Sequence, residues 1–517
     1  MKAKLKNIIL ICLIVIFCIT ISPITMQNDT YYTIAIGEHI LKNGIDMQDP
    51  FSWHEYLPYT YPHWLYDVGT YLVYGAGQAI SAETGGYAAI YILTCIISAI
   101  LGITVFKINK KICKNTIISF LITLLTMYSL KSYIAARAQL VTFILFALEI
   151  YFIEQFLITP KKRYILGLIV IPILIANLHL AVWWFYFILY LPYIAEYIIA
   201  KISKSEDKII LTRIELTLNK NVKYLIIIML VCLLTGLLTP LGTTPYTYLI
   251  DTMMGNTTKN ISEHLPLTLV EHVEAVVALG IIIFILACTK SKMTLRDAFM
   301  LSGLTLLMFY SRRQQSMFFL IGGIILNKLL LEIIQNHKEE GLKILEEILL
   351  SKIPIALISL LVVVISVYFI VQKEGNTFVS EANYPVQASE WILENLNLEE
   401  IRLYNEYNYG SYLLFKGIPV FIDSRADLYA PEFNQTTRKT NDGKDIFMDF
   451  INSSNLNIFY EETFEKYGIT HVILYKNSKM NLVITNTNDG KYECLYEDKY
   501  FTIYEIKDQP INVDILD

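Results

Sequence analysis

The chain carries about eleven hydrophobic runs, many of them close to 20 residues long. Inside a bilayer every backbone polar group must be satisfied within the protein, so runs of this length can only be helices. A mean hydropathy of +0.46, with 17% charged residues, excludes a soluble protein whose polar surface covers one core. The runs lie near residues 7–24, 85–106, 115–131, 139–158, 164–178, 180–199, 222–240, 270–288, 298–310, 316–334 and 353–371.

Lys and Arg residues fall on alternate connections between the runs. The positive-inside rule places these connections, and the N-terminus, in the cytoplasm. With about eleven transmembrane helices, the C-terminal region and the loop 25–84 then lie outside it, and 64–79 is expected to be an interfacial helix. The connections 203–221 and 335–351 are read as amphipathic cytoplasmic helices or plain connectors.

These observations predict two domains: a transmembrane helical domain over 1–372 and an extracytoplasmic α/β domain over 373–517. The second holds 24 acidic residues against 13 Lys and Arg, so it does not suit nucleic acid as a partner. Its short Val, Ile and Tyr runs alternate with helical stretches, which predicts a small, mostly parallel sheet with an antiparallel edge. The expected strands are 401–404, 419–423, 470–475, 492–496 and 501–504.

The first outer loop holds the most informative acids. Asp29 follows the first run directly, where a carboxylate could act as a base toward an acceptor hydroxyl. The alternative is that Asp29 caps a helix beginning at Thr30. Asp49 precedes Pro50 and could simply open a turn, and His63 could be an aromatic anchor at headgroup depth.

Basic and polar residues recur at the other outer connections. Arg137, Arg312 and Arg313 lie on the side where positive charge is under-represented, and guanidinium groups suit a lipid phosphate or pyrophosphate. The alternative is that they snorkel into water from the ends of helices. His179 and Glu263 lie at similar positions and are candidate substrate contacts.

Two polar clusters follow predicted strands of the C-terminal domain. Tyr409 lies in the first cluster, and Asp423 and Arg425 lie in the second. Ligands bind at the carboxyl ends of parallel strands, which makes these residues candidate acceptor or substrate contacts. A purely structural Asp423–Arg425 ion pair is the alternative.

Taken together, these motifs resemble a largely uncharacterised family of bacterial multi-pass membrane proteins. That family in turn resembles the C-type glycosyltransferase (GT-C) superfamily, which uses polyprenol-linked sugars. The residues that carry the resemblance are Asp29, Tyr31, Tyr32, Gly37, Gly44, Asp49, Pro50, Phe51, Ser52, Trp64, Leu65, Asn177, His179, Tyr409, Gly410, Tyr412, Phe421, Asp423 and Arg425.

The resemblance implies a catalytic acid in the first outer loop, which falls on Asp29, and a sugar donor linked to a lipid phosphate. Thr30 follows Asp29 where many members have a second acid, so a divalent metal, Mg²⁺ or Mn²⁺, stays a candidate cofactor without assigned ligands. The cluster around Tyr409 is also similar to a motif of oligosaccharyltransferase catalytic subunits. Asn408 stands at the acid's position there, so no peptide binding is assigned.

The function expected from these features is a hexosyl- or pentosyltransferase in a bacterial plasma membrane. It would move a sugar from a polyprenyl phosphate to a cell-envelope glycan, lipid or protein, with Asp29 as base, Asp49 and His63 in support, and the three arginines on the donor phosphate. The competing hypothesis is a non-enzymatic transporter or an assembly protein that binds glycan or protein.

Overall fold

The computed structural model describes residues 3–203, 208–211, 213–289, 291–336, 348–435, 443–487 and 490–507. Their contacts divide the chain into two compact units. We call Met1–Ile24, Ile90–Tyr246 and Ile261–Gly375 the helical unit, and Thr25–Ala89, Thr247–Asn260 and Asn376–Asp517 the mixed unit. The domain limits 1–372 and 373–517 stay predictions.

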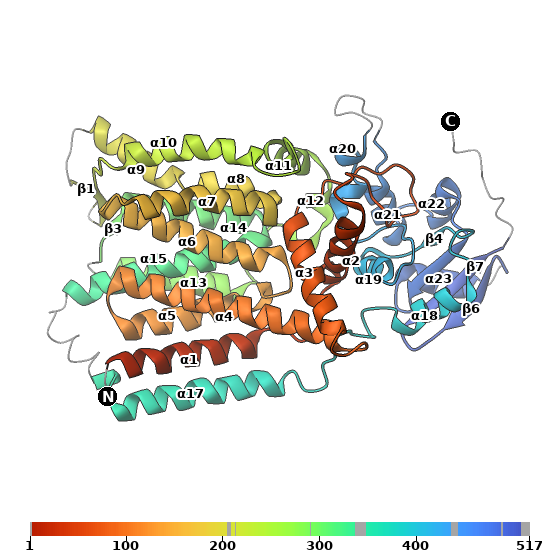
Figure 1. Ribbon diagram of the computed structural model, residues 1–517, viewed down its shortest axis with the longest axis horizontal. Helices are drawn as coiled ribbons and strands as arrows, with labels where there is room; N and C mark the ends of the chain where they lie inside the picture. The colour runs from red at the N-terminus through yellow and green to blue at the C-terminus, as the bar shows by residue number, and fades with distance from the viewer. Residues whose placement is uncertain are drawn as a thin grey trace. The chain divides into compact units, whose positions relative to one another are not determined.

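The helical unit is a bundle (Figure 1). In it, α1 packs against α5 and α17, α6 against α7, and α15 against α5 and α14. Its main helices are α1 (Ala3–Ile21), α4 (Gly85–Cys113), α5 (Thr116–Ser129), α6 (Ala138–Ile158), α7 (Lys162–Leu178), α8 (Trp183–Ile188), α9 (Leu191–Ile202), α10 (Val222–Cys232), α13 (Val273–Cys288), α14 (Leu295–Tyr310), α15 (Gln315–Asn336) and α17 (Lys352–Val371).

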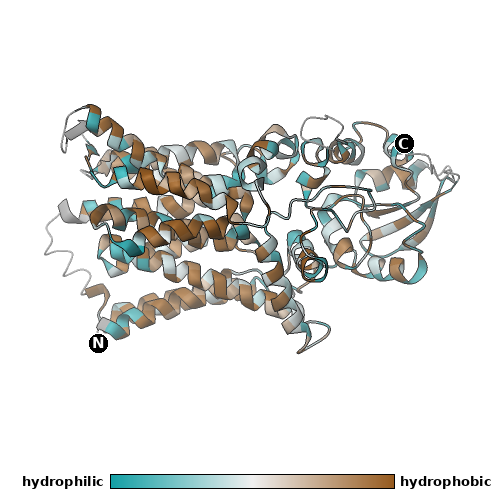
Figure 2. Cartoon of the chain, turned by 45° about the horizontal axis from the view of Figure 1, so that its top comes forward, coloured by the Kyte–Doolittle hydropathy of each residue, from teal (hydrophilic) through white to brown (hydrophobic). Residues whose placement is uncertain are grey.

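Every predicted apolar run is helical, and the outward faces of these helices are apolar as well (Figure 2). On α17, for example, Leu357 and Leu361 are exposed. Exposed apolar surface of this extent requires lipid as solvent, so the chain is a membrane protein. Within the described residues, six helices are long and apolar enough to cross a membrane, and three apolar helices are shorter. The count of about eleven spans stays a prediction.

Of the two alternatives for 203–221, the amphipathic helix is wrong for the described part of that stretch. It forms β1 (Lys208–Leu211) and β2 (Ile214–Leu216), which pair antiparallel, and β2 pairs parallel with β3 (Met293–Thr294). The Ile and Leu residues between 209 and 216 fit a short strand as well as one face of a helix. Hydrogen bonding to neighbouring strands favours the strand. Most of 335–351 lies outside the described residues.

The mixed unit contains a four-stranded sheet in the order β4-β5-β7-β6. β4 (Leu403–Tyr404) and β5 (His471–Tyr475) are parallel, whereas β7 (Phe501–Ile506) pairs antiparallel with both β5 and β6 (Tyr492–Glu497). The sheet is therefore mostly antiparallel, which corrects the prediction. The helices of this unit are α2 (Asn28–Asn43), α3 (Trp64–Gln78), α11 (Thr244–Met254), α12 (Thr257–Asn260), α18 (Val386–Asn395), α19 (Tyr407–Phe415), α20 (Pro431–Asn434), α21 (Ile446–Ser454), α22 (Tyr460–Tyr467) and α23 (Lys479–Thr487).

The predicted strand 419–423 does not join this sheet. Val420 instead forms an isolated parallel bridge with Ser52, and its N–H donates to Phe51 O at 3.2 Å. Trp53 adds a bond from its indole N–H to Leu403 O at 3.0 Å. The loop before α3 therefore bonds to backbone groups of Leu403 and Val420 that a neighbouring strand could otherwise have bonded.

α2 and α3 pack closely because Gly37 lies between them. A Cβ at Gly37 would come within 2.1 Å of the backbone oxygen of Asp67 and 2.7 Å of Tyr71 Cβ. No rotamer change can relieve a clash with backbone, so the crossing requires glycine. The helix predicted over 64–79 is confirmed as α3.

Gly37→Ala is expected to lower the free energy of unfolding by about 1–3 kcal/mol, because the two helices must separate. Gly75→Ala on α3 is the matched control, since a Cβ there meets nothing within 4 Å. It should be neutral or stabilise the protein by up to about 1 kcal/mol through helix propensity. Thermal unfolding in detergent compares the two variants, and equal effects would contradict the packing argument.

Candidate functional site

Asp29 lies inside the first turn of α2 and does not cap it. The N-cap residue is Gln27, and α2 begins at Asn28, so the capping alternative for Asp29 is wrong. The Asp29 side chain is half-buried. Asp29 is therefore a partly accessible acid at the N-terminal end of α2.

α2 is fixed to α19 by contacts on either side of Asp29. The Asn28 amide donates to Tyr407 O at 3.0 Å. The Tyr31 ring packs edge-on against Tyr384 and Tyr412, with centroid distances of 4.9 and 5.0 Å. Such aromatic contacts stabilise packing beyond their buried area. The start of α2 is therefore held in one position by residues distant in the sequence.

His63 lies next to α2, where the predicted supporting role requires it. Its ring stacks on Tyr32 at 6.2 Å, and its Nδ1 is 3.9 Å from Asp67 Oδ2. The pair thus connects the first turn of α3 with the segment that follows Asp29.

Asp67 is a buried acid that the sequence analysis missed. It is fully buried, and the polar groups near it are the Thr33 hydroxyl and the His63 ring. Burial raises the pKa of the Asp67 carboxyl well above its usual value. The signal was present: Asp67, Thr70, Tyr74 and Gly77 recur at the spacing of the buried face of a helix.

Asp49, Asp423 and Arg425 form one buried ion cluster. Arg425 Nη1 donates to Asp49 Oδ1 at 2.6 Å, and its Nη2 and Nε donate to the two oxygens of Asp423 at 2.7 and 2.9 Å. Asp423 also accepts from the Tyr429 hydroxyl at 2.5 Å. The arginine side chain is 3% exposed and both acids are fully buried.

The carboxylate of Asp49 is fully engaged in this cluster. It accepts backbone N–H bonds from Phe51 at 3.3 Å and Ser52 at 2.9 Å. Burial raises the pKa of Asp49, but the Arg425 guanidinium and the bonds from Ser52 more than offset this, so the pKa lies below its usual value. Asp49 therefore joins the loop between α2 and α3 to Arg425. This arrangement agrees with the alternative that Asp423 and Arg425 form a structural ion pair.

Tyr409 packs in the core of the mixed unit. It is 2% exposed, its hydroxyl donates to Ile473 O at 2.7 Å, and its ring meets Phe501 at 5.2 Å. Its hydroxyl already has an acceptor inside the protein, so its contacts are those of a core residue.

Within the mixed unit, a segment of α11 and α12 contacts the residues that follow Arg425. The Tyr248 hydroxyl donates to Asp427 Oδ2 at 2.7 Å, and the Thr257 hydroxyl donates to Asp427 Oδ1 at 3.3 Å. Asn256 adds a bond to Asp445 at 2.6 Å. Asp427 thus connects the segment 247–260 to the C-terminal part of the chain.

In the helical unit, two of the predicted arginines pair with acids. Arg137 Nη1 is 3.1 Å from Glu263 Oε1, and Arg312 Nη2 is 3.2 Å from Glu271 Oε2. Both arginine side chains are about a quarter exposed, at 23% and 24%. The Arg312 Nε also donates to Pro266 O at 3.2 Å, so the connection 261–271 and the turn before α15 form one polar surface.

Arg313 differs from these two arginines. No hydrogen bond or ion pair within the described residues engages its side chain, which acts through space on Glu263 and His264. Burial, followed by the Arg313 charge, lowers the pKa of His264 to about 4. Burial raises the pKa of Glu263, but Arg137 and Arg313 more than offset it. Arg313 thus adds a positive charge to the surface formed by Arg137, Arg312 and their two glutamates.

His179 lies inside the bundle. It is 3% exposed, and its Nδ1 is 2.9 Å from the Thr142 hydroxyl on α6. The contact joins the end of α7 to α6.

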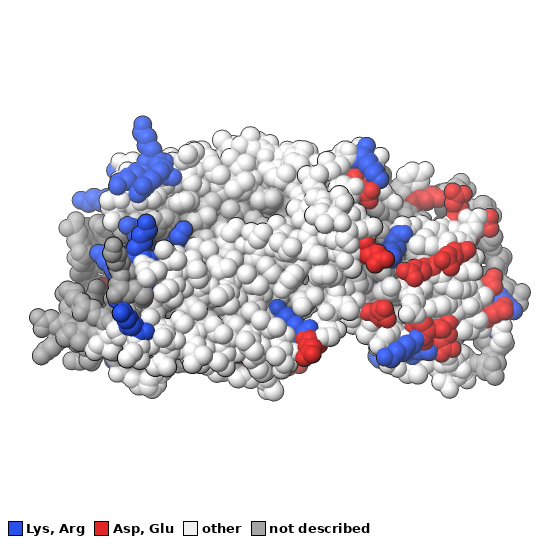
Figure 3. Space-filling model, turned by 60° about the horizontal axis from the view of Figure 1, so that its bottom comes forward, with Lys and Arg blue, Asp and Glu red and all other residues white. Residues whose placement is uncertain are grey.

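Charge is distributed differently over the two units. On the face shown in Figure 3, Lys and Arg of the helical unit gather mainly at the end that carries β1 and β3 in Figure 1, and Asp and Glu predominate on the mixed unit. Within the helical unit, the surface around Arg313 lies at the opposite ends of α6, α14 and α15 from β3.

A divalent metal stays a predicted cofactor without assigned ligands. Thr30 stands beside Asp29, and Asp49 is occupied by Arg425. In the part of the chain that the structure describes, no group of three or more His, Cys, Asp and Glu side chains could hold an ion.

The fold has counterparts among solved structures, whereas no family model and no curated protein matches the chain. The archaeal oligosaccharyltransferase AglB from Archaeoglobus fulgidus, in complex with an inhibitory peptide and a dolichol-phosphate, matches with a TM-score of 0.56 at 12% identity. The match covers 98% of this chain and 75% of that one. The apo oligosaccharyltransferase of Archaeoglobus fulgidus matches with a TM-score of 0.58 at 12% identity, over 99% and 76% of the two chains. The chain thus shares its fold with these two archaeal oligosaccharyltransferase structures.

Proposed function

We propose that this protein is a membrane glycosyltransferase that moves a sugar from a polyprenyl-phosphate-linked donor to an acceptor outside the cytoplasm. The observation that carries the proposal is the fold, which matches oligosaccharyltransferases over 98–99% of the chain. One of these was solved with a dolichol-phosphate and a peptide, which supports a lipid-linked donor and makes protein one of the acceptor classes, beside glycan and lipid.

Asp29 is the proposed general base. The acceptor hydroxyl gives its proton to the Asp29 carboxylate while its oxygen bonds to the anomeric carbon. The bond from that carbon to the phosphate oxygen breaks, and its electron pair leaves with the polyprenyl phosphate. Asp29 suits this role because it is an acid in the first turn of α2 whose side chain is only partly buried, so an acceptor hydroxyl can reach it. The anchoring through Asn28 and Tyr31 keeps it in place.

The arginines are proposed to hold the donor phosphate as it becomes the leaving group. Arg313 is the leading candidate for binding the donor phosphate. Among the described residues no carboxylate is paired with it, so a phosphate oxygen can bond to its guanidinium group without displacing one. Arg137 and Arg312 would add charge while they keep Glu263 and Glu271. Fixed donors at a site of developing charge cost little reorganisation, so this stabilisation can exceed the effect of the base.

Asp49, Asp423 and Arg425 are proposed as positioning residues, because their buried cluster fixes the loop that joins α2 to α3. His63 supports the same region through Tyr32. His179, Glu263 and Tyr409 make internal contacts, so their action on an acceptor would be indirect. The proposed location is a bacterial plasma membrane, with the N-terminus in the cytoplasm and the mixed unit outside it.

The test of this function is transfer of label from a series of radiolabelled polyprenyl-phosphate hexoses and pentoses by purified protein in lipid. Label that moves to a glycan, lipid or peptide acceptor would establish the class. Failure with every donor, combined with retained glycan binding by the full-length protein, would instead support a binding or assembly protein.

Arg313→Ala is expected to lower kcat/KM for the lipid-linked donor by about 10²–10³-fold, as the loss of a charge-stabilising donor does elsewhere. Arg312→Ala should cost less, because Arg312 is shared with Glu271. Arg163→Ala at the start of α7 is the matched control, since the Arg163 side chain bonds to the Tyr164 hydroxyl and lies over its ring, away from the surface around Arg313. Equal kinetics for Arg313→Ala and Arg163→Ala would remove Arg313 from the phosphate site.

A further inference from the structure

Glu149 is a buried acid near the middle of α6 that the proposed function does not use. It lies eleven residues after Ala138, which is about 16 Å along the helix axis. Its side chain is fully buried, inside a helix that is otherwise apolar around it. Acids within membrane-spanning helices are rare and usually have a defined role.

Neither oxygen of Glu149 has a hydrogen-bond partner among the described residues. No charged side chain in that part of the chain acts on it. The titratable groups that face it are Tyr186, Tyr190 and Cys232. The two tyrosine hydroxyls bond to each other at 2.5 Å, and Tyr186 donates to Leu168 O at 2.7 Å, so these hydroxyls are already engaged.

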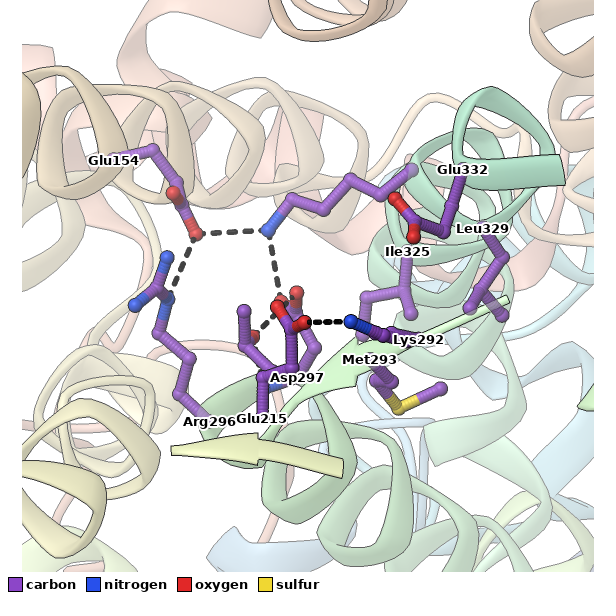
Figure 4. Close-up of a pocket in the computed structure, with 11 residues that line it drawn as sticks. Glu154, Glu215, Lys292, Met293, Arg296, Asp297, Ile325, Leu329 and Glu332 are labelled. Atoms are coloured by element: carbon purple, nitrogen blue, oxygen red, sulfur yellow. Dashed lines mark hydrogen bonds and ion pairs between the residues drawn. The ribbon is translucent and has the colours of Figure 1, made fainter. Parts of the chain in front are cut away.

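Glu154, five residues further along α6, has the opposite surroundings. Its Oε1 accepts from Lys328 Nζ at 2.9 Å and from the Tyr193 hydroxyl at 3.1 Å, and Arg296 Nε is 3.7 Å away. It borders a cavity of about 190 Å³, shown in Figure 4, where its carboxylate points toward Arg296. On α6, therefore, Glu154 is paired with Lys328 and Arg296, whereas Glu149 has no Lys or Arg beside it among the described residues.

An isolated carboxylate inside a low-dielectric bundle is so costly that such a group takes up a proton instead. We infer that Glu149 is a proton-binding site within the membrane bundle, a neutral carboxylic acid as long as α6 stays packed on α7 and α8. Ionisation requires water or a cation to reach the carboxyl group. Release of this proton therefore accompanies separation of these helices.

The first test is infrared difference spectroscopy of the full-length protein in lipid, at neutral pH and at pH about 9. The spectrum of wild type minus Glu149→Gln is expected to show the C=O stretch of a protonated carboxylic acid at both pH values. Wild type minus Glu154→Gln, the matched control, should show the bands of an ionised carboxylate. Carboxylate bands in the Glu149 difference spectrum at neutral pH would overturn the inference.

A second measurement keeps the inference testable if a variant folds poorly. Glu149→Met replaces a neutral group by one of similar length, so the unfolding temperature should stay the same or rise. Glu154→Met leaves Lys328 and Arg296 with fewer carboxylates, and its unfolding temperature should fall by several degrees. A fall for Glu149→Met as large as that for Glu154→Met would show that Glu149 is ionised and paired.

Discussion

Asp29→Asn is expected to fold and insert like the wild type and to lose sugar transfer by about 10²–10⁴-fold or more. The amide keeps the size of the side chain but cannot take the proton of an acceptor hydroxyl. Transfer from the best polyprenyl-phosphate donor measures the effect, and gel filtration with thermal unfolding checks the fold.

Asp46→Asn is the control for this variant, because Asp46 lies just after α2 and its described partners, His39, Gln48 and Tyr61, are all close to it in the sequence. It should transfer sugar at close to the wild-type rate. An Asp29→Asn variant as active as Asp46→Asn would remove Asp29 from the mechanism, even if the protein is a glycosyltransferase.

Arg425→Met is expected to have the largest effect on stability, lowering the free energy of unfolding by about 3–5 kcal/mol. The substitution leaves Asp49 and Asp423 buried without their cation, and each must then take up a proton or draw in water. Denaturant unfolding of the purified protein measures the loss.

The pH dependence of this loss follows from Asp49. Its pKa is lower in the folded protein than its usual value, so the stability it contributes is present above the usual carboxyl range and disappears as the pH falls through the folded value. The difference between wild type and Arg425→Met should therefore narrow in acid. If the free energies of unfolding of wild type and Arg425→Met differ by under about 1 kcal/mol at neutral pH, the cluster does not stabilise the fold as its geometry indicates.

The apolar helices and the helix over 64–79 could be predicted from the sequence, because length and periodicity fix them locally. The mostly antiparallel pairing of the sheet could not be predicted, since the place of β7 between β5 and β6 depends on which strands meet in space. The Asp-Pro sequence at 49–50 predicted a turn. It could not show that Asp49 pairs with Arg425, because the two residues are 376 positions apart in the sequence. Asp67 was within reach of sequence reasoning, because its spacing from Thr70 and Tyr74 places it on a buried face.

The Asp49–Arg425 contact also sets a timescale for biosynthesis. The ribosome adds about 5–20 residues per second, so the 376 residues between the two partners take roughly 20–75 s to make. Throughout that interval Arg425, the cation that pairs with Asp49 when it is buried, has not been made. Tyr412 of α19, which packs against Tyr31 of α2, is also absent for most of it. The segment 25–89 stays without these partners, and accessible to chaperones and proteases, until α19 and Arg425 have been translated. Quality control that samples this segment would therefore sense whether synthesis has reached the C-terminal region.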